Sequence, residues 1–312
     1  MDEWLKQVKD RWNETDYDSL RSELVNQFGV RELTYLASGD DSDTFLYGDC
    51  YVVKVPKHEN VIRMQKREFQ LYSFLNKQKL SFQTPKVVYQ GDRYNVMNYL
   101  SGQRITYKEY NALSEKEQDA LAYDEAVFLR ELHNIHFDPE ESFFLAAHQN
   151  KKQQYKDDYE KVIHILTENG KMNEELRDKI DSWYEHIFQI DFLFDYIPCI
   201  THNDFSADNL VFRNNRLYGV IDFGDFAIGD PDNDFLCLLD CSTDDFGKEF
   251  GRKVLYYYGH KAPEIAEKKA EINDAYWTIQ QILLGDKRQD RRLLAKGLDE
   301  LSDLNTRVLD NL

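Results

Sequence analysis

The chain has 312 residues, of which 42% are hydrophobic and 14% aromatic, and its net charge is −18. These proportions predict a globular chain long enough for two lobes, each with its own core, and exclude a largely disordered protein. No apolar run reaches the length of a membrane span, so no membrane partner is expected, and the negative charge disfavours binding to nucleic acid. Residues 1–10 are expected to form an amphipathic helix and not a signal peptide, so we expect a cytoplasmic protein. We also expect a monomer.

Residues 1–100 carry alternating apolar patterns separated by turn residues, which predicts strands at 33–37, 44–47, 50–55, 86–90 and 94–97. An apolar stripe at three- and four-residue spacing predicts one helix over about 59–77. A small five-stranded antiparallel sheet with one helix is therefore expected as the N-lobe.

Residues 101–312 are predicted to form a mainly helical C-lobe. Ser114 and Glu117 have the spacing of a capping box, which opens a helix that runs to about His133. Further helices are expected at 153–167, 173–188, 244–258, 264–284 and 288–309. The fold class is thus α+β and bilobal, with the lobes joined at the polar residues 101–103 and an active site in the cleft there.

Acidic residues concentrate in the second part of the chain. Residues 1–100 hold 14 Lys and Arg against 15 Asp and Glu, while residues 101–312 hold 25 against 42. Twelve acids and three bases lie from Asp195 to Glu249. Such a field attracts polycationic ligands, although acidity that only maintains solubility is an alternative.

A catalytic motif for phosphoryl transfer follows at residues 202–224. Asp204 and Asn209 are five residues apart, and Asp222 opens the sequence Asp-Phe-Gly. This order matches a kinase base followed by two oxygen ligands for Mg²⁺. A hairpin over residues 210–221 would return Asp222 to the side of Asn209. The alternative is a surface loop of solvated turn formers.

A charged pair is predicted in the N-lobe. Lys54 lies within an apolar strand, and Glu68 falls on the apolar stripe of the next helix. Each charge is costly to bury alone, so pairing them resolves both and reproduces the Lys–Glu pair of kinases. In the alternative, Lys54 reaches solvent at a sheet edge and Glu68 is solvated.

Two further segments are candidate nucleotide contacts. The loop 38–43 holds one glycine and no glycine-rich motif, so it is expected to meet phosphate through backbone N–H groups and the hydroxyls of Ser38 and Ser42. An ordinary polar hairpin is the alternative. At the end of the last N-lobe strand, the Asn98 carbonyl and the Leu100 amide are the candidates for the purine edge, and either ATP or GTP would fit.

These segments resemble the aminoglycoside 2''-phosphotransferases, which are protein-kinase-like antibiotic kinases. The matching stretches are 36–45, 51–56, 66–69, 202–207 and 219–235. The resemblance covers about 31–281 and leaves residues 1–30 without a role. It implies a bilobal protein-kinase-like fold that transfers the γ-phosphoryl of ATP or GTP to a hydroxyl, expected at the 2'' position, of an aminoglycoside, with Mg²⁺ as cofactor.

The resemblance also implies residue roles. Asp204 would be the base and Asn209 and Asp222 the Mg²⁺ ligands, with Lys54 paired to Glu68 at the nucleotide. His202 would be a structural member of the loop, and Asp234 would brace that loop through backbone hydrogen bonds.

For the acceptor, the family implies a ligand with several ammonium groups, which acids recognise by charge-assisted hydrogen bonds. By position the candidates are Asp225, Glu249 and Asp274, with Trp277 offering a ring face three residues after Asp274. Each could instead be a solvated acid or a core aromatic.

Two rival functions stay open at this point. One is a related small-molecule kinase acting on a macrolide, a choline-like amine or another metabolite. The other is a catalytically silent nucleotide-binding module that presents an acidic surface, although such a module has no need of the base Asp204.

Overall fold

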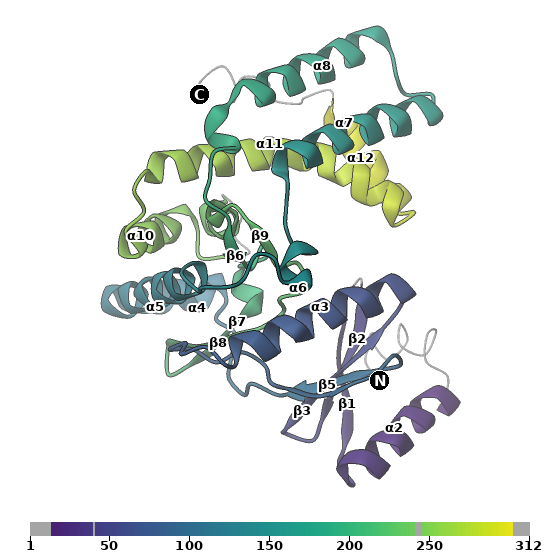
Figure 1. Ribbon diagram of the computed structural model, residues 1–312, viewed down its shortest axis with the longest axis vertical. Coiled ribbons are helices and arrows are strands. Elements are labelled where there is room, and N and C mark those ends of the chain that lie inside the picture. Colours follow the sequence, from purple (N-terminus) through teal and green to yellow (C-terminus); the bar gives the residue numbers. More distant parts are fainter. Residues whose placement is uncertain (1–13, 40, 241–244, 302–312) are drawn as a thin grey trace. The chain divides into compact units, whose positions relative to one another are not determined.

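The computed structural model describes residues 14–39, 41–240 and 245–301 (Figure 1). The chain divides into two compact units, the first formed by Met1–Asn76 with Thr84–Ser101 and the second by Lys77–Gln83 with Gly102–Leu312. The predicted helix at residues 1–10 lies outside the described residues. Among the helices that are described, none combines the length and apolar character needed to cross a membrane.

The first unit is a five-stranded antiparallel sheet with the strand order β1-β2-β3-β5-β4 and helices on both faces. Its elements are α2 (Glu14–Phe28), β1 (Leu33–Ser38), β2 (Ser42–Tyr47), β3 (Tyr51–Pro56), α3 (Glu59–Leu75), β4 (Val87–Gln90) and β5 (Asn95–Asn98). The five predicted strands and the predicted helix are confirmed. Helix α2 was not predicted.

Strand alternation assigns the two faces of this sheet. Val53 of β3 belongs to a buried cluster that includes Leu20 and Leu24 of α2. Because successive side chains point to opposite faces, Lys54 is turned away from α2 and toward α3. Helix α2 therefore covers one face with apolar side chains and leaves the other face to α3 and the charged pair.

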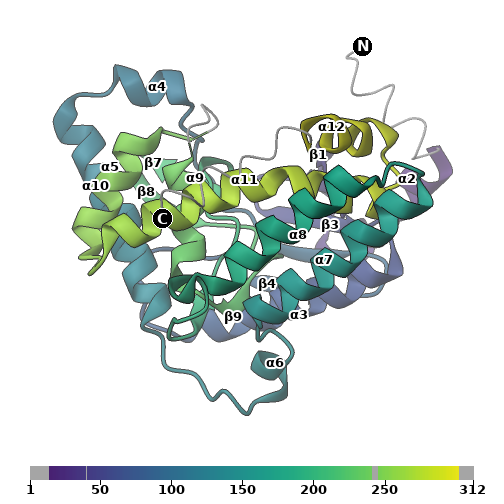
Figure 2. The same cartoon turned by 90° about the horizontal axis from the view of Figure 1, so that it is seen from above.

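The second unit is mainly helical, as predicted. Its helices are α4 (Tyr107–Ala112), α5 (Glu115–His133), α6 (Ser142–Leu145), α7 (Lys151–Glu168), α8 (Glu174–Gln189), α9 (Leu236–Leu239), α10 (Lys248–Tyr258), α11 (Pro263–Lys287) and α12 (Arg291–Leu301). Both halves of the Ser114–Glu117 capping box form. Helices α7, α8 and α11 lie together (Figure 2), and Trp183 of α8 stacks on Tyr276 of α11 at 5.3 Å.

Two helix boundaries differ from the prediction. Helix α10 begins at Lys248 because Gly247 has a φ of 87°, which a helix cannot continue through. The long C-terminal pattern is interrupted at Gln289, whose φ is 54°, and the Asp290 carboxylate then accepts N–H groups of the first turn of α12. Residues 244 and 302–309 of the predicted helices lie outside the described chain.

In the described part of this unit, the polar loops are connected by two short antiparallel strand pairs and three 3₁₀ turns. These elements are β6 (Cys199–Thr201) with β9 (Ala227–Gly229), β7 (Leu210–Arg213) with β8 (Arg216–Val220), and the 3₁₀ turns η1 (Asp191–Leu193), η2 (Ala207–Asn209) and η3 (Pro231–Phe235). The β7–β8 turn uses Asn214 and Asn215 at φ values of 50° and 56°, which suits the right-handed twist of a tight hairpin. The predicted hairpin is confirmed.

Candidate active site

Asp204 lies in the loop 202–209 that follows β6, and Asn209 ends that loop. The Nδ2 group of Asn209 donates to the Oδ2 atom and to the main-chain oxygen of Asp204, each at 2.8 Å. The amide therefore holds the carboxylate in one orientation through two bonds. Only the nitrogen of the Asn209 amide is used by these bonds, so its oxygen is free of Asp204.

His202 is fully buried and contacts both the loop 202–209 and residue 221 through its ring nitrogens. The N–H of Asp204 donates to its Nδ1 atom at 3.3 Å, and its Nε2 atom lies 2.9 Å from the Ile221 carbonyl. An acceptor at Nδ1 and a donor at Nε2 define the neutral tautomer with its proton on Nε2. In this arrangement the ring links the loop to residue 221.

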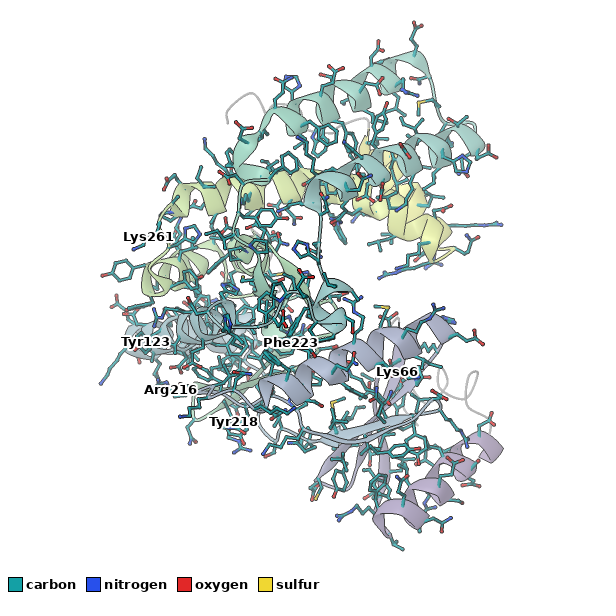
Figure 3. The ribbon with its side chains drawn as sticks, viewed as in Figure 1. Lys66, Tyr123, Arg216, Tyr218, Phe223 and Lys261 are labelled. Carbon is teal, nitrogen blue, oxygen red and sulfur yellow. The ribbon has the colours of Figure 1, made fainter. Side chains whose placement is uncertain are left out.

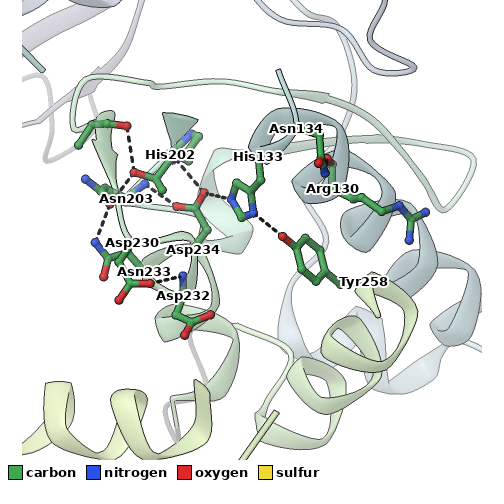
Figure 4. A network of polar contacts seen from close by, with 12 residues as sticks. Arg130, His133, Asn134, His202, Asn203, Asp230, Asp232, Asn233, Asp234 and Tyr258 are labelled. Carbon is green, nitrogen blue, oxygen red and sulfur yellow. Dashed lines mark hydrogen bonds and ion pairs between the residues drawn. The ribbon is translucent and has the colours of Figure 1, made fainter. Parts of the chain in front are cut away.

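Asp234 joins the same loop from η3 and is fully buried (Figure 4). Its carboxylate accepts the N–H groups of His202 at 2.9 Å and of Asn203 at 2.7 Å, which is the backbone contact expected from the sequence. The Nε2 atom of His133 lies 3.0 Å from the same carboxylate, and its Nδ1 atom lies 3.0 Å from the Tyr258 hydroxyl. His133 and Tyr258 were not predicted.

Two residues next to the site have left-handed backbones. Asn203 has a φ of 64° and Asp222 a φ of 61°, a conformation uncommon outside glycine and frequent at functional sites. The N–H of Ile221 donates to the Asn209 carbonyl at 2.9 Å, so the hairpin returns Asp222 to the neighbourhood of Asn209. Phe223, labelled in Figure 3, is fully buried and anchors the segment.

The electrostatic setting of Asp204 suits a proton acceptor. Partial burial raises the pKa of Asp204, the hydrogen bond from Asn209 lowers it, and the nearby charges of Asp222 and Asp208 raise it further. The net result is a pKa above the ordinary value of an aspartate. A base whose pKa moves toward neutrality is a stronger acceptor for a hydroxyl proton.

Asn209 and Asp222 offer an amide oxygen and a carboxylate, which are the hard ligands that Mg²⁺ prefers. Across residues 14–39, 41–240 and 245–301 no three His, Cys, Asp or Glu side chains form a metal-binding group. Mg²⁺ is usually held by one or two protein oxygens together with substrate phosphates, so this donor set fits it and does not fit a closed protein site.

In the first unit, Lys54 and Glu68 form the predicted contact. The Nζ atom of Lys54 lies 3.3 Å from Oε1 of Glu68, and the Tyr72 hydroxyl donates to the same oxygen at 2.9 Å. The Glu68 side chain is only 2% exposed and that of Lys54 is 14% exposed. Tyr72, one turn further along α3, was not predicted as a partner.

Both predicted serines of the loop 38–43 are engaged within the first unit. The Ser38 hydroxyl donates to Asp43 at 2.7 Å, and Lys57 donates to Ser38 at 2.7 Å. The Ser42 hydroxyl accepts from buried Gln65 at 2.6 Å. These bonds order both ends of the loop, and a phosphate at this loop would compete with the contacts of Lys57.

Gln65 extends these hydrogen bonds into a buried polar network that reaches β5. Its Oε1 atom accepts from Nδ2 of Asn95 at 2.5 Å, and the Oδ1 atom of Asn95 accepts the Gly91 N–H at 3.1 Å. Gln65 and Asn95 are 4% and 2% exposed. A buried polar chain in which each amide is paired fixes the position of Ser42 relative to β5.

The backbone N–H groups near the two predicted purine contacts, Asn98 and Leu100, differ in whether they already form hydrogen bonds. The N–H of Asn98 donates to the Lys86 carbonyl at 2.9 Å, and that of Tyr99 donates to the Cys50 carbonyl at 2.7 Å. The Leu100 N–H makes no backbone hydrogen bond within the described part of the chain, although Leu100 is 7% exposed. An N–H in such a place is suited to a ligand acceptor.

The four predicted acceptor residues lie on three separate elements of the second unit. Asp225 is exposed beside the loop 202–209, where its carbonyl accepts from Asn203 at 3.0 Å. Glu249 of α10 is 83% exposed and forms an ion pair with Arg252 at 2.5 Å. Arg252 also binds Glu267 at 2.8 Å. Because Arg252 is shared between two carboxylates, it neutralises only part of the charge of Glu249.

Asp274 and Trp277 share an exposed face of α11, as their spacing predicts. Partial burial, with the carboxylates of Asp240 and Glu271 nearby, raises the pKa of Asp274 to about 6, and the ammonium of Lys248 opposes this. Trp277 is 46% exposed. An acid that shares its surroundings with other acids is a favourable contact for a cation.

Two buried acids behind the site were missed by the sequence. Asp245, just before α10, accepts the Ala207 N–H of the loop 202–209 and is 6% exposed. Glu125 of α5 is fully buried, and neither of its oxygens has a hydrogen-bond partner among the residues that the structure describes. Burial, with Asp245 and Asp124 nearby, raises the pKa of Glu125 well above its ordinary value. Asp245 lies in an acid-rich stretch and Glu125 in a helical one, and neither stretch contains a sequence motif that marks these residues as buried.

Comparisons with known proteins place these residues in context. A family model described as "Phosphotransferase enzyme family" matches residues 32–269, a span that includes Lys54, Asp204, Asn209 and Asp222. Among solved structures, the chain is similar to ADP-bound aminoglycoside phosphotransferase APH(2'')-Ib, with 57% identity, a TM-score of 0.90, and coverage of 93% of this chain and 98% of that one. It is also similar to APH(2'')-IIa in a ternary complex with streptomycin and ATP, with 57% identity, a TM-score of 0.90, and coverage of 93% and 97%.

The curated relatives match a shorter stretch. Aminoglycoside 3'-phosphotransferase of Escherichia coli is 31% identical over 168 residues, which are 51% of this chain and 55% of that relative. The chain therefore spans about half the length of the curated relatives that it matches.

Proposed function

Because this chain belongs to the phosphotransferase enzyme family, we propose that it transfers the γ-phosphoryl group of ATP or GTP to a hydroxyl, at the 2'' position, of an aminoglycoside antibiotic. Modification of the drug would confer resistance. The first unit would bind the nucleotide, and the second would bind the acceptor and carry out the transfer. The nucleotide and acceptor named for the two solved structures at 57% identity support this choice.

One arrangement supports the proposal most strongly. Asp204 is oriented by two hydrogen bonds from Asn209, and its pKa is raised by burial and by neighbouring acids. Asp204 would accept the proton of the acceptor hydroxyl as that oxygen attacks the γ-phosphorus. Since phosphoryl transfer depends chiefly on positioning and charge stabilisation, a rigid base next to two oxygen ligands is what the reaction requires.

Asn209 and Asp222 would hold Mg²⁺ through the amide oxygen and the carboxylate. When bound, the ion would neutralise the phosphate oxygens. The hydrogen bonds from Asn209 to Asp204 use only the amide nitrogen, so one side chain can serve both the base and the ion. Asp234 and His202 would hold the loop that carries both groups.

The nucleotide would be held by groups of the first unit. Lys54, oriented by Glu68, would contact the phosphates, and the loop with Ser38 and Ser42 would cover them. The Leu100 N–H and the Asn98 carbonyl would bind the purine edge. Backbone groups of this kind accommodate adenine or guanine, so we propose both ATP and GTP as donors.

The acceptor would be a cationic aminoglycoside bound by acids of the second unit. Asp274 and Trp277 share one exposed face, where a carboxylate and an indole ring suit an ammonium group on a sugar. Asp225 and Glu249 are proposed as further contacts, the latter in exchange for its bond to Arg252. We propose a monomer that acts in the cytoplasm, where its donor is found, without a nucleic-acid or membrane partner.

An acceptor panel tests this function. The purified protein is incubated with Mg²⁺ and either ATP or GTP together with one acceptor at a time, chosen from several aminoglycosides, a macrolide and choline, and the release of ADP or GDP is measured. We expect release that depends on the aminoglycosides and is strongly reduced, but still measurable, with Asp204→Asn. Release with the macrolide or choline alone would contradict the proposed substrate, and the absence of any turnover would favour a silent binding module.

A further inference from the structure

The turn η3, which supplies Asp234 to the loop 202–209, is held from its other side by three basic side chains. Asp230, which caps the start of the turn, and Asp232, within it, are 1% and 6% exposed. Lys269 comes from α11, Lys151 from the start of α7, and His260 from the segment between α10 and α11. None of these three bases was predicted as a site residue.

Lys269 is at the centre of this cluster and is 4% exposed. Its Nζ atom lies 2.7 Å from Asp230 and 2.7 Å from Asp232. Burial would raise the pKa of Asp232, but His260 and Lys269 lower it to about 2. One ammonium thus bridges two buried carboxylates that would otherwise repel each other, and an uncompensated buried charge is strongly unfavourable.

The other two bases complete the support of η3. Lys151 lies 3.1 Å from Asp230 and donates to the Asn233 side chain at 3.0 Å. The Nε2 atom of His260 lies 2.7 Å from Oδ1 of Asp232. Asp230, Asp232 and Asn233 therefore each have a basic partner on a helix or on a segment joining helices.

The opposite side of η3 contacts the loop directly (Figure 4). Asp234 accepts the N–H groups of His202 and Asn203, and the Asn233 amide donates to the Asn203 side chain at 3.2 Å. The two residues after Asp232 along the turn thus hold the residues just before Asp204. A shift of η3 would be transmitted to the base through these bonds.

Helix α11 carries both Lys269 and the candidate acceptor residues. Asp274 is five residues after Lys269, about 7.5 Å along one continuous helix. Lys269 is buried against η3, whereas Asp274 and Trp277 are on the exposed part of the helix. The helix therefore connects the place where the acceptor is proposed to bind with the turn that holds the catalytic loop.

We propose that Lys269 is a positioning residue that ties α11 to η3 and thereby fixes the place of Asp204 relative to an acceptor bound on α11. This proposal depends on the function proposed above, in which Asp204 is the base. Lys269 touches neither substrate nor metal in this account. It acts through Asp230 and Asp232 and then through Asp234.

The test is a double-mutant cycle between Lys269→Met and Asp204→Asn. Methionine keeps most of the unbranched stem of lysine and removes the charge. A misplacement of the base by about 1 Å lowers turnover by as much as about 100-fold. We expect Lys269→Met to lower kcat by about 10- to 100-fold, with the KM values for nucleotide and aminoglycoside changed by less than about threefold. In the Asp204→Asn background, the same substitution should change kcat by less than about threefold.

Two further variants control this cycle. Lys287→Met removes an exposed lysine from the last turn of the same helix and should leave kcat unchanged. Lys269→Arg keeps the charge with a different shape and should restore part of the lost kcat. If Lys269→Met does not fold, the cycle is run with Lys269→Arg, for which we expect a smaller loss of kcat that also disappears in the Asp204→Asn background.

The outcomes separate the two proposals. Additive effects of Lys269 and Asp204, an unchanged kcat in Lys269→Met, or an effect on KM alone would overturn the positioning role while leaving the function intact. If the unmodified protein phosphorylates no aminoglycoside, it is the proposed function that fails.

Discussion

Asn209 donates from one amide group to both the carboxylate and the main-chain oxygen of Asp204, at 2.8 Å in each case. The residue proposed to bind Mg²⁺ thereby also orients the residue proposed as base. The five-residue spacing allows this because the 3₁₀ turn η2 brings the ends of the loop together. Base and ligand are therefore expected to respond together when either is changed.

Replacing Asp204 tests the base directly. Asp204→Asn keeps the shape and removes the proton acceptor, so kcat should fall by about 10²- to 10⁴-fold while the KM for nucleotide stays nearly constant. Because burial raises the pKa of Asp204, kcat/KM of the unmodified enzyme should decline as the pH is lowered through that raised value. Steady-state kinetics across pH measure both effects. Asp208→Asn, in the same loop but exposed, is the control, and equal losses in the two variants would exclude the assigned role.

Removing the Asn209 side chain should produce two separable defects. Asn209→Ala loses a proposed Mg²⁺ ligand, so the Mg²⁺ concentration for half-maximal activity should rise by about tenfold or more. It also frees Asp204, so kcat should remain low even at saturating Mg²⁺. Titration of activity with Mg²⁺ distinguishes the two. An unchanged Mg²⁺ requirement would mean that Asn209 only orients Asp204. Asn111→Ala on exposed α4 serves as the control.

The ion pair of the first unit should respond unequally to its two partners. Lys54→Met leaves the Glu68 carboxylate buried without its cation, which should lower the free energy of unfolding by on the order of 3 kcal/mol and raise the KM for nucleotide. Glu68→Gln keeps an acceptor for Lys54 and Tyr72 and should cost less. Denaturant unfolding and nucleotide titration measure both quantities. Lys66→Met, which removes an exposed cation from α3, should change neither, and a similarly small effect of Lys54→Met would contradict the pairing.

Binding of a polycation at Asp274 should depend on pH. The pKa of Asp274 is raised to about 6, so the carboxylate becomes fully charged only above that pH. The KM for an aminoglycoside should therefore fall as the pH rises through about 6. Asp274→Asn should raise this KM and flatten its pH dependence, as measured from kinetics between pH 5 and 8. Asp286→Asn, exposed near the end of the same helix, should behave like the unmodified protein; an unaltered profile in Asp274→Asn would remove Asp274 from the acceptor site.

Glu125 should make the fold less stable as the pH rises. Its pKa in the folded state is raised well above the ordinary value, so the folded protein binds more protons than the unfolded chain between the two values. Stability from this group is therefore fully present at low pH and is lost as the pH rises toward the folded pKa. Glu125→Gln keeps the shape without the charge and should raise the melting temperature increasingly with pH. Glu115→Gln on the exposed start of α5 is the control. Equal melting temperatures at high pH would contradict a buried neutral acid.

The sequence predicted those features that local spacing determines. Strand alternation and the apolar stripe of α3 placed Lys54 and Glu68 in facing elements, because burying either charge alone is unfavourable. The apolar runs on either side of Asn214 and Asn215 predicted the hairpin. The resemblance drawn from the matching stretches is confirmed by the family match over residues 32–269 and by the solved structures at 57% identity. The expectation that acids gather in the second part did not reveal which acids are free and which, like Glu249, are already paired.

What the sequence did not predict depends on distant partners. The links between Lys269 and Asp230, between Asp245 and Ala207, and between Gln65 and Asn95 join residues 30 or more positions apart, and no local pattern encodes them. Helix α2 was not predicted because its sequence contains no recognised motif, although its leucines cover one face of the sheet. The left-handed backbone of Asp222 depends on its surroundings, because aspartate tolerates this conformation without requiring it.

The most direct test of the account is to identify the product. An aminoglycoside incubated with the protein, Mg²⁺ and ATP or GTP is analysed by mass spectrometry, and the position of any phosphate is assigned by NMR. We expect a singly phosphorylated drug with its phosphate on the 2'' hydroxyl, and far less of this product from Asp204→Asn in the same reaction time. An unmodified drug recovered from a folded, nucleotide-binding protein, or equal product from Asp204→Asn, would contradict it.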